Sequence, residues 1–159
     1  MIELLVVISI TAIVAAIAAP SLRGTMNNLR QKSAQSLLIS DLNQARAEAI
    51  KRNARVLVCA RNAAGTGCAG STNWSVGWVA CTGDTACDAA TATNLNPFIV
   101  RPALDAALTL TASAATVRFN ANSSQGSAGT VVTLTLGGTW SGATARIVNV
   151  AGTGNISKQ

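Results

Sequence analysis

Residues 1–24, MIELLVVISITAIVAAIAAPSLRG, decide the architecture around which the rest of the chain must be built. The sixteen residues 4–19 carry no charge, and only two of them are polar. Because a bilayer core of roughly 30 Å needs about 20 helical residues, this run predicts a membrane-spanning helix of slightly short length. Glu3 sits at the edge of the run, where a carboxylate among lipid tails costs several kcal/mol unless it is paired. We therefore expect Glu3 to have a function that outweighs this cost.

The flanks of the apolar run leave its orientation open. A cleaved signal peptide is the alternative, because residues 16–20, AIAAP, offer the small side chains of a cleavage site, but no basic residue precedes the run. The nearest basic residues, Arg23, Arg30 and Lys32, follow it and by the positive-inside rule would hold that side in the cytoplasm. A short basic leader upstream of residue 1 would resolve both difficulties, and we expect one.

The composition argues against enzymatic chemistry. Of the 159 residues, 49% are apolar and 11% charged, and histidine is absent, which removes the commonest general base and metal ligand. The six acidic residues form no recognisable catalytic motif. We therefore predict that the protein is not an enzyme and needs no cofactor or metal ion.

Four cysteines, Cys59, Cys68, Cys81 and Cys87, allow three pairings if all are oxidised. Their intervals of nine, thirteen and six residues lack the short knuckles of a zinc site. We favour disulfides between sequence neighbours, Cys59 with Cys68 and Cys81 with Cys87. Because such bonds persist only in an oxidising compartment, the chain beyond the apolar run should lie outside the cytoplasm.

Several segments together resemble a known family. The stretch at 1–24 resembles the N-terminus of mature type IV pilins and type II secretion pseudopilins, where a prepilin peptidase cuts after a glycine and the new terminus is methylated. The family's usual Phe-Thr pair and leader are missing before residue 1. The likeness continues through LISDLNQARAEAIKRNARVLVC at 38–59, then loosens through VRFNANSSQG and ARIVNVAGTGNI, and is strongest to the FimT/GspH group of minor pilins.

The resemblance implies a fold and a function. The fold is an α+β pilin fold, with a long N-terminal helix kinked near Pro20 and packed on an antiparallel β-sheet head. The implied function is that of a structural subunit of a pilus or pseudopilus filament, with other pilins and the assembly machinery as partners. The chain would reside in the bacterial inner membrane before it enters an extracellular pilus or a periplasmic pseudopilus. In pilins the residue matching Glu3 neutralises the α-amino group of a neighbouring subunit.

The residues themselves predict a division into two parts. Residues 1–24 form the membrane and assembly half of the helix, with Pro20 and Gly24 loosening its end. Residues 25–159, called the head below, comprise an amphipathic half-helix at 25–53 and a β-rich region at 54–159. The predicted core stripe of this half-helix is Ala34, Leu38, Leu42, Ala45 and Ala49. Strands are expected at 55–60, 74–80, 98–101, 107–111, 116–119, 130–136 and 146–150, and the three tryptophans in the core.

The charge suggests a second function. The net charge is +6, and after Asp105 three cations, Arg118, Arg146 and Lys158, occur with no acidic side chain. Such a surface attracts phosphate backbones, so a DNA-binding minor pilin for DNA uptake is an alternative function. The resemblance itself leaves a further alternative, a GspH-like pseudopilin of type II secretion. FimT-like proteins implicated in DNA uptake carry a Gly-Arg-x-Arg stretch near the C-terminus, where this chain reads GTGNIS at 152–157.

Overall fold

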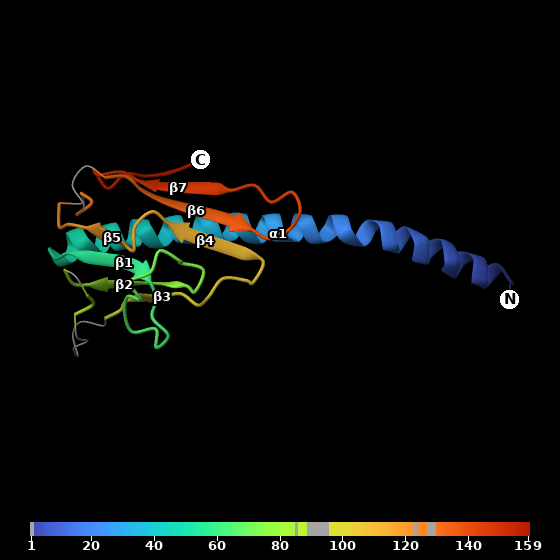
Figure 1. The fold of residues 1–159 in the computed structure, drawn as a ribbon, viewed down its shortest axis with the longest axis horizontal. Coiled ribbons are helices and arrows are strands. Elements are labelled where there is room, and N and C mark those ends of the chain that lie inside the picture. Colours follow the sequence, from blue (N-terminus) through green and yellow to red (C-terminus); the bar gives the residue numbers. More distant parts are fainter. Residues whose placement is uncertain (1, 85, 89–95, 123, 127–129) are drawn as a thin grey trace.

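A computed structural model describes residues 2–84, 86–88, 96–122, 124–126 and 130–159. For residues 15–22 it describes the backbone only. One helix, α1 (Ile2–Arg52), forms a rod whose second half lies along the β-rich region of the head and whose first half projects away from it (Figure 1). The predicted α+β architecture of long N-terminal helix and antiparallel sheet is confirmed.

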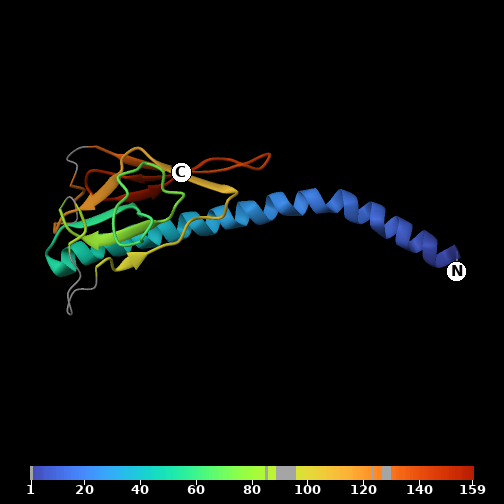
Figure 2. The same cartoon turned by 60° about the horizontal axis from the view of Figure 1, so that its bottom comes forward.

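The helix passes through Pro20 and Gly24 without a break. Figure 2 shows that the rod bows along its length, so the change of direction expected near these residues is taken up as curvature within a continuous helix. Proline removes one backbone donor from the helical ladder, and glycine adds backbone freedom, which together allow bending without termination. An added Cβ at Gly24 would have no atom within 4 Å.

The end of α1 follows the sequence prediction. The helix ends at Arg52, and Asn53 takes a left-handed conformation with φ 47°, which its short polar side chain tolerates. The amide of Ala54 donates to the carbonyl of Ala49 at 3.2 Å, so one of the last helical carbonyls keeps a partner. Lys51 and Arg52 lie in the last turn, where positive charge offsets the helix dipole.

The head contains two four-stranded antiparallel sheets. The first has the order β3-β2-β1-β5 and the second β4-β6-β7-β8. Their bounds are β1 (Val56–Ala60), β2 (Trp78–Thr82), β3 (Ile99–Val100), β4 (Leu108–Ala112), β5 (Thr116–Phe119), β6 (Val132–Gly138), β7 (Arg146–Val150) and β8 (Ile156–Lys158). Six of these lie within two residues of their predicted bounds. β8 was not predicted, because a strand of three residues after a Gly-containing turn is too short to show alternating apolar and polar residues.

The strand predicted at 74–80 is wrong in its first half. Trp74 to Gly77 form a turn, closed by a hydrogen bond from the Gly77 amide to the Trp74 carbonyl at 3.0 Å, and β2 starts only at Trp78. Gly77 has φ 95°, and a Cβ there would lie 2.2 Å from the carbonyl oxygen of Arg101. The close approach of these two backbone segments is a tertiary constraint that the pattern of apolar residues does not contain.

The core lies between α1 and both sheets. The whole predicted stripe of α1 is buried, at 8% exposure for Ala34 and 0% for the other four residues. Trp74 and Trp78 are buried and Trp140 packs against the core while partly exposed, so the prediction for the tryptophans is confirmed. The head half of α1 therefore holds the two sheets together.

Candidate functional site

The projecting half of α1 is apolar and exposed over residues 2–14, where the structure describes its side chains. Its large apolar side chains from residue 2 to 14 are all more than half exposed, between 53% for Val6 and 79% for Ile2. The two polar residues of this segment are satisfied within the helix, since Ser9 Oγ donates to the Leu5 carbonyl at 2.7 Å and Thr11 Oγ1 to the Ile8 carbonyl at 2.9 Å. Neither hydroxyl therefore needs a hydrogen-bond partner outside the helix, as an apolar environment requires.

Glu3 is the one charged side chain among the described residues of this rod, which run from 2 to 14. It lies in the first turn of α1, where the positive end of the helix dipole favours a carboxylate. Among the described residues, no helix is both long and apolar enough to be assigned as a membrane span.

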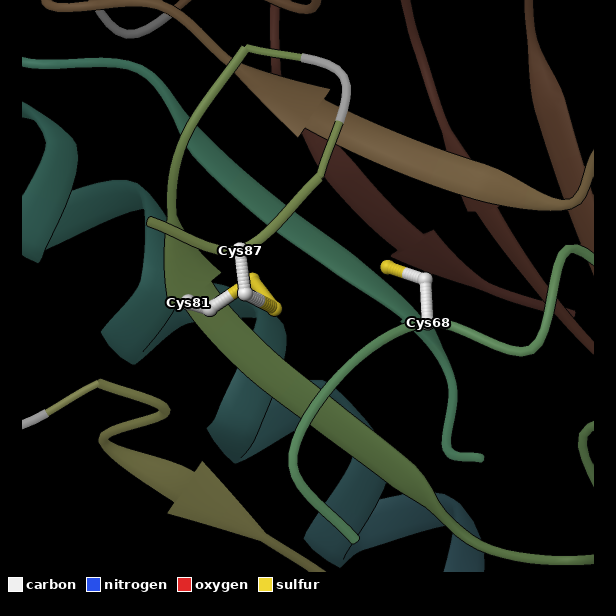
Figure 3. Close-up of side chains that lie close together, drawn as sticks. All are labelled: Cys68, Cys81 and Cys87. Atoms are coloured by element: carbon white, nitrogen blue, oxygen red, sulfur yellow. A yellow bond between two sulfur atoms is a disulfide. The ribbon is translucent and has the colours of Figure 1, made fainter. Parts of the chain in front are cut away.

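Two disulfides brace one side of the head. Cys59 bonds Cys68, and Cys81 bonds Cys87, which is the pairing between sequence neighbours that the spacing favoured. The sulfur atoms of Cys68, Cys81 and Cys87 all lie within 4.8 Å of one another, and Figure 3 shows Cys68 beside the bonded pair. Because thiolates bind metals and these sulfurs are all in disulfides, the cluster is a structural brace in this state.

The three cations proposed for DNA do not form one surface. Arg118 lies on β5 in the first sheet, opposite Leu57 of β1, and its Nε is buried without a hydrogen-bond partner. Arg146 begins β7 and Lys158 ends β8, both in the second sheet. The structure therefore separates Arg118 from the other two.

A groove between α1 and the second sheet collects Arg146 and Lys158 with a third cation. Its walls are Lys32, Gln35 and Ser36 of α1 and Arg146, Lys158 and Gln159 of the sheet. It continues into a second hollow that shares three of these residues and adds Ile39 and Ile156. We call this surface the α1–β8 groove. Lys32 was not among the cations predicted to bind DNA, because only the fold places it opposite the last two strands.

Buried amides of α1 position the groove. Gln31 is fully buried, and its Nε2 donates to the carbonyls of Leu136 at 3.0 Å and Thr144 at 2.9 Å. Its Oε1 accepts a hydrogen bond from Arg146 Nε at 3.2 Å. Gln35 Nε2 reaches the Ile147 carbonyl at 3.4 Å. One helical face thus fixes the β6–β7 hairpin and orients the Arg146 guanidinium at the groove.

A buried ion pair joins α1 to the first sheet. Both carboxylate oxygens of Asp41 accept hydrogen bonds from Arg101 at 2.8 Å, and Oδ2 also accepts one from Trp78 Nε1 at 2.9 Å. Hydrogen bonding to this carboxylate raises the pKa of Arg101 above its ordinary value. The sequence does not predict this pair, since its members are far apart in the chain and carry no shared motif.

The comparisons with known proteins agree with this geometry. The family model for the type II transport protein GspH matches residues 34–154. The chain belongs to the GspH family. Two crystal structures of the type IV minor pilin FimU from Pseudomonas aeruginosa strain PAO1 share its fold at 18% identity, with TM-scores of 0.59 and 0.60. Each alignment covers 80% of this chain and 91% or 87% of the FimU chain. No curated protein matches at a significant level.

Membership in the GspH family assigns the chain its general role. The head matched by the family model and the pilin fold make it a structural subunit of a pilus or pseudopilus filament, as the sequence predicted. Pilin and pseudopilin families are structural, which agrees with the prediction that the chain is not an enzyme.

Proposed function

We propose that residues 1–24 hold the chain in the bacterial inner membrane before assembly and then enter a bundle of equivalent helices in a pilus or pseudopilus. The head, residues 25–159, would lie outside the cytoplasm, where its two disulfides persist. One observation carries the proposal: the large apolar side chains of residues 2–14 all remain exposed, whereas the head buries an extensive apolar core.

Burial of apolar side chains supplies only part of the driving force for the association of such helices. Transfer of apolar side chains from lipid to a helix bundle brings little hydrophobic gain, so association depends on close packing and on polar contacts. The sequence of residues 12–19 is rich in alanine, which permits close approach of helices. Glu3 is the polar contact that we propose to drive assembly, by pairing with the α-amino group of a neighbouring subunit.

The substitution Glu3→Ala tests this proposal. We expect the chain to insert in the membrane normally, since removing a charge favours the apolar environment, and to enter filaments at a yield at least about tenfold lower, because the neighbour's amino group is left unpaired. The measurement is the partition of the full chain between membrane and sheared filament fractions.

Thr11→Ala is the matched control in the same segment. The Thr11 hydroxyl bonds only to carbonyls of its own helix, so its loss should leave filament yield unchanged. Normal filament yield from Glu3→Ala and Glu3→Leu would contradict the assembly role of Glu3.

The identity of the filament is the finer question. The family model points to type II transport, and the shared fold to minor pilins, and both kinds of filament are built from chains with this architecture. Immunogold labelling of the head distinguishes a major subunit along a fibre, a minor subunit at its end, and a pseudopilin confined to the cell envelope.

DNA binding stays a prediction from the sequence. Of its three proposed cations, two line the α1–β8 groove, while Arg118 lies on the other sheet. A DNA contact would therefore rest on Lys32, Arg146 and Lys158 in place of the predicted set.

A further inference from the structure

The α1–β8 groove is strongly basic. Lys32, Arg146 and Lys158 line it, and no acidic side chain does so. Within the described parts of the chain, none of the ion pairs uses any of these three cations. Three positive groups in one hollow repel each other, so the groove favours an acidic occupant.

The groove also offers an unpaired strand edge. β8 is the outermost strand of its sheet, and Ile147 exchanges two hydrogen bonds with Gln159, at 3.1 and 2.9 Å. Hydrogen-bonded pairs alternate along an antiparallel ladder, so Asn149 and Ser157 form the next one, and the amides and carbonyls of Ile156 and Lys158 point away from β7. Among the described residues, no backbone–backbone hydrogen bond outside the strands engages these groups. An extended segment can pair with them.

We propose that the α1–β8 groove binds an extended, acidic segment of another filament subunit, which adds a strand to β8. The inference rests on the proposed function, since the binding partner is another subunit of the same filament. The groove adjoins the head half of α1, which continues directly into the half that we propose to enter the filament, so the candidate partner is the neighbouring subunit packed beside α1.

The two ends of the groove define the pattern of the bound segment. Side chains two residues apart on a strand share a face, and Ile156 and Lys158 have this spacing in β8. Ile39 of α1 faces the same hollow as Ile156, whereas Lys32 and Arg146 gather near Lys158. The bound segment therefore carries an apolar residue and an acidic residue two positions apart.

A strand explains more of the groove than a nucleic acid does. Phosphates would neutralise the three cations, but they would leave the free edge of β8 and the apolar floor at Ile39 and Ile156 without partners. An acidic strand satisfies all three features at once, because main-chain hydrogen bonds supply affinity and the pockets select side chains.

Site-specific photocrosslinking in assembled filaments tests the proposal. A benzoylphenylalanine at position 159 places the probe on the groove while leaving its cations intact, and the same probe at position 51, on the exposed end of α1, is the control. We expect a crosslink from position 159 to an acidic extended segment of another pilin subunit, identified by mass spectrometry, and no such product from position 51.

Variants separate the charge from the strand edge. Lys158→Glu and Lys32→Glu should each lower the crosslink yield about tenfold, and exchanging the opposing acid for lysine should restore the Lys158→Glu variant. Lys158→Pro should lower the yield further than Lys158→Ala, because proline removes an amide that points at the partner and takes no part in the β7 ladder.

The outcomes distinguish this inference from the proposed function. A chain that enters filaments but crosslinks from position 159 only to DNA, only to a protein outside the filament, or no better than from position 51 overturns the groove proposal alone. A wild-type chain that never reaches the filament fraction overturns the proposed function, and the groove proposal with it.

Discussion

The two halves of α1 share one continuous backbone and meet opposite environments. From residue 31 to 49 the helix buries its apolar stripe under two sheets and uses buried glutamines to fix strands. From residue 2 to 14 it exposes nearly every large apolar side chain. The amphipathic half buries one face within the chain, whereas the described apolar half, residues 2–14, buries none of its large apolar side chains. The two halves of one helix therefore differ in where their apolar surface goes, since one half buries it within the head and the other leaves it on the outside.

Truncating one leucine in each half is the strongest test of this separation. Leu42→Ala, at a fully buried site, should lower the free energy of unfolding by about 3 kcal/mol through lost contacts and a residual cavity. Leu5→Ala, at a 66% exposed site, should change it by less than about 0.5 kcal/mol. Denaturant unfolding of the full chain in detergent, followed by tryptophan fluorescence, gives both values. Equal losses of unfolding free energy in the two variants would contradict the distinction between the two halves of α1.

The buried ion pair sharpens the comparison within the head. Asp41→Ala should lower the free energy of unfolding by about 2–3 kcal/mol, because it leaves the Arg101 guanidinium and the Trp78 indole without their hydrogen-bond acceptor. Water can reach the 36% exposed arginine side chain, which limits the loss. Arg30→Ala breaks the exposed pair with Asp105 and should cost less than about 1 kcal/mol. The same unfolding measurement compares them, and a cost for Asp41→Ala no greater than that for Arg30→Ala would contradict this assignment.

The smallest effect is a pH dependence at the end of α1. A hydrogen bond from Arg52 holds the pKa of Glu48 below its ordinary value, with Lys51 contributing through its charge. Since the folded pKa is the lower one, the stabilisation is present above the unfolded pKa and is lost as pH falls through the folded pKa. Glu48→Gln should thus cost under about 1 kcal/mol at pH 7, and this cost should shrink as pH falls through the folded pKa of Glu48. A cost that does not change with pH would show that the ion pair is not its source.

Local patterns in the sequence predicted much of the fold. The 3.6-residue recurrence of Leu38, Leu42 and Ala45 identified the buried stripe, and the basic last turn with Asn53 placed the end of the helix, because both signals lie within a few residues of chain. Short β-branched runs located most strands. The extended strand expected from Trp74 failed, because a backbone approach at Gly77 from a distant segment forces a turn there.

The candidate sites were less predictable. Cysteine spacing was enough to favour the two local disulfides, since short loops bring their ends together readily. The Asp41–Arg101 pair and the gathering of Lys32 with Arg146 and Lys158 join residues from distant segments. Nothing in the spacing of those residues marks them as neighbours.

Local sequence is enough to predict one long helix with an apolar half that carries a lone acid and an amphipathic half that packs on β-strands, because periodicity and charge are properties of neighbouring residues. The folded chain alone shows which cations share a surface, which carboxylate is buried with which arginine, and which strand edge stays open. Those relations depend on how the two sheets are stacked against α1, and the chain must close long loops before any of them exists.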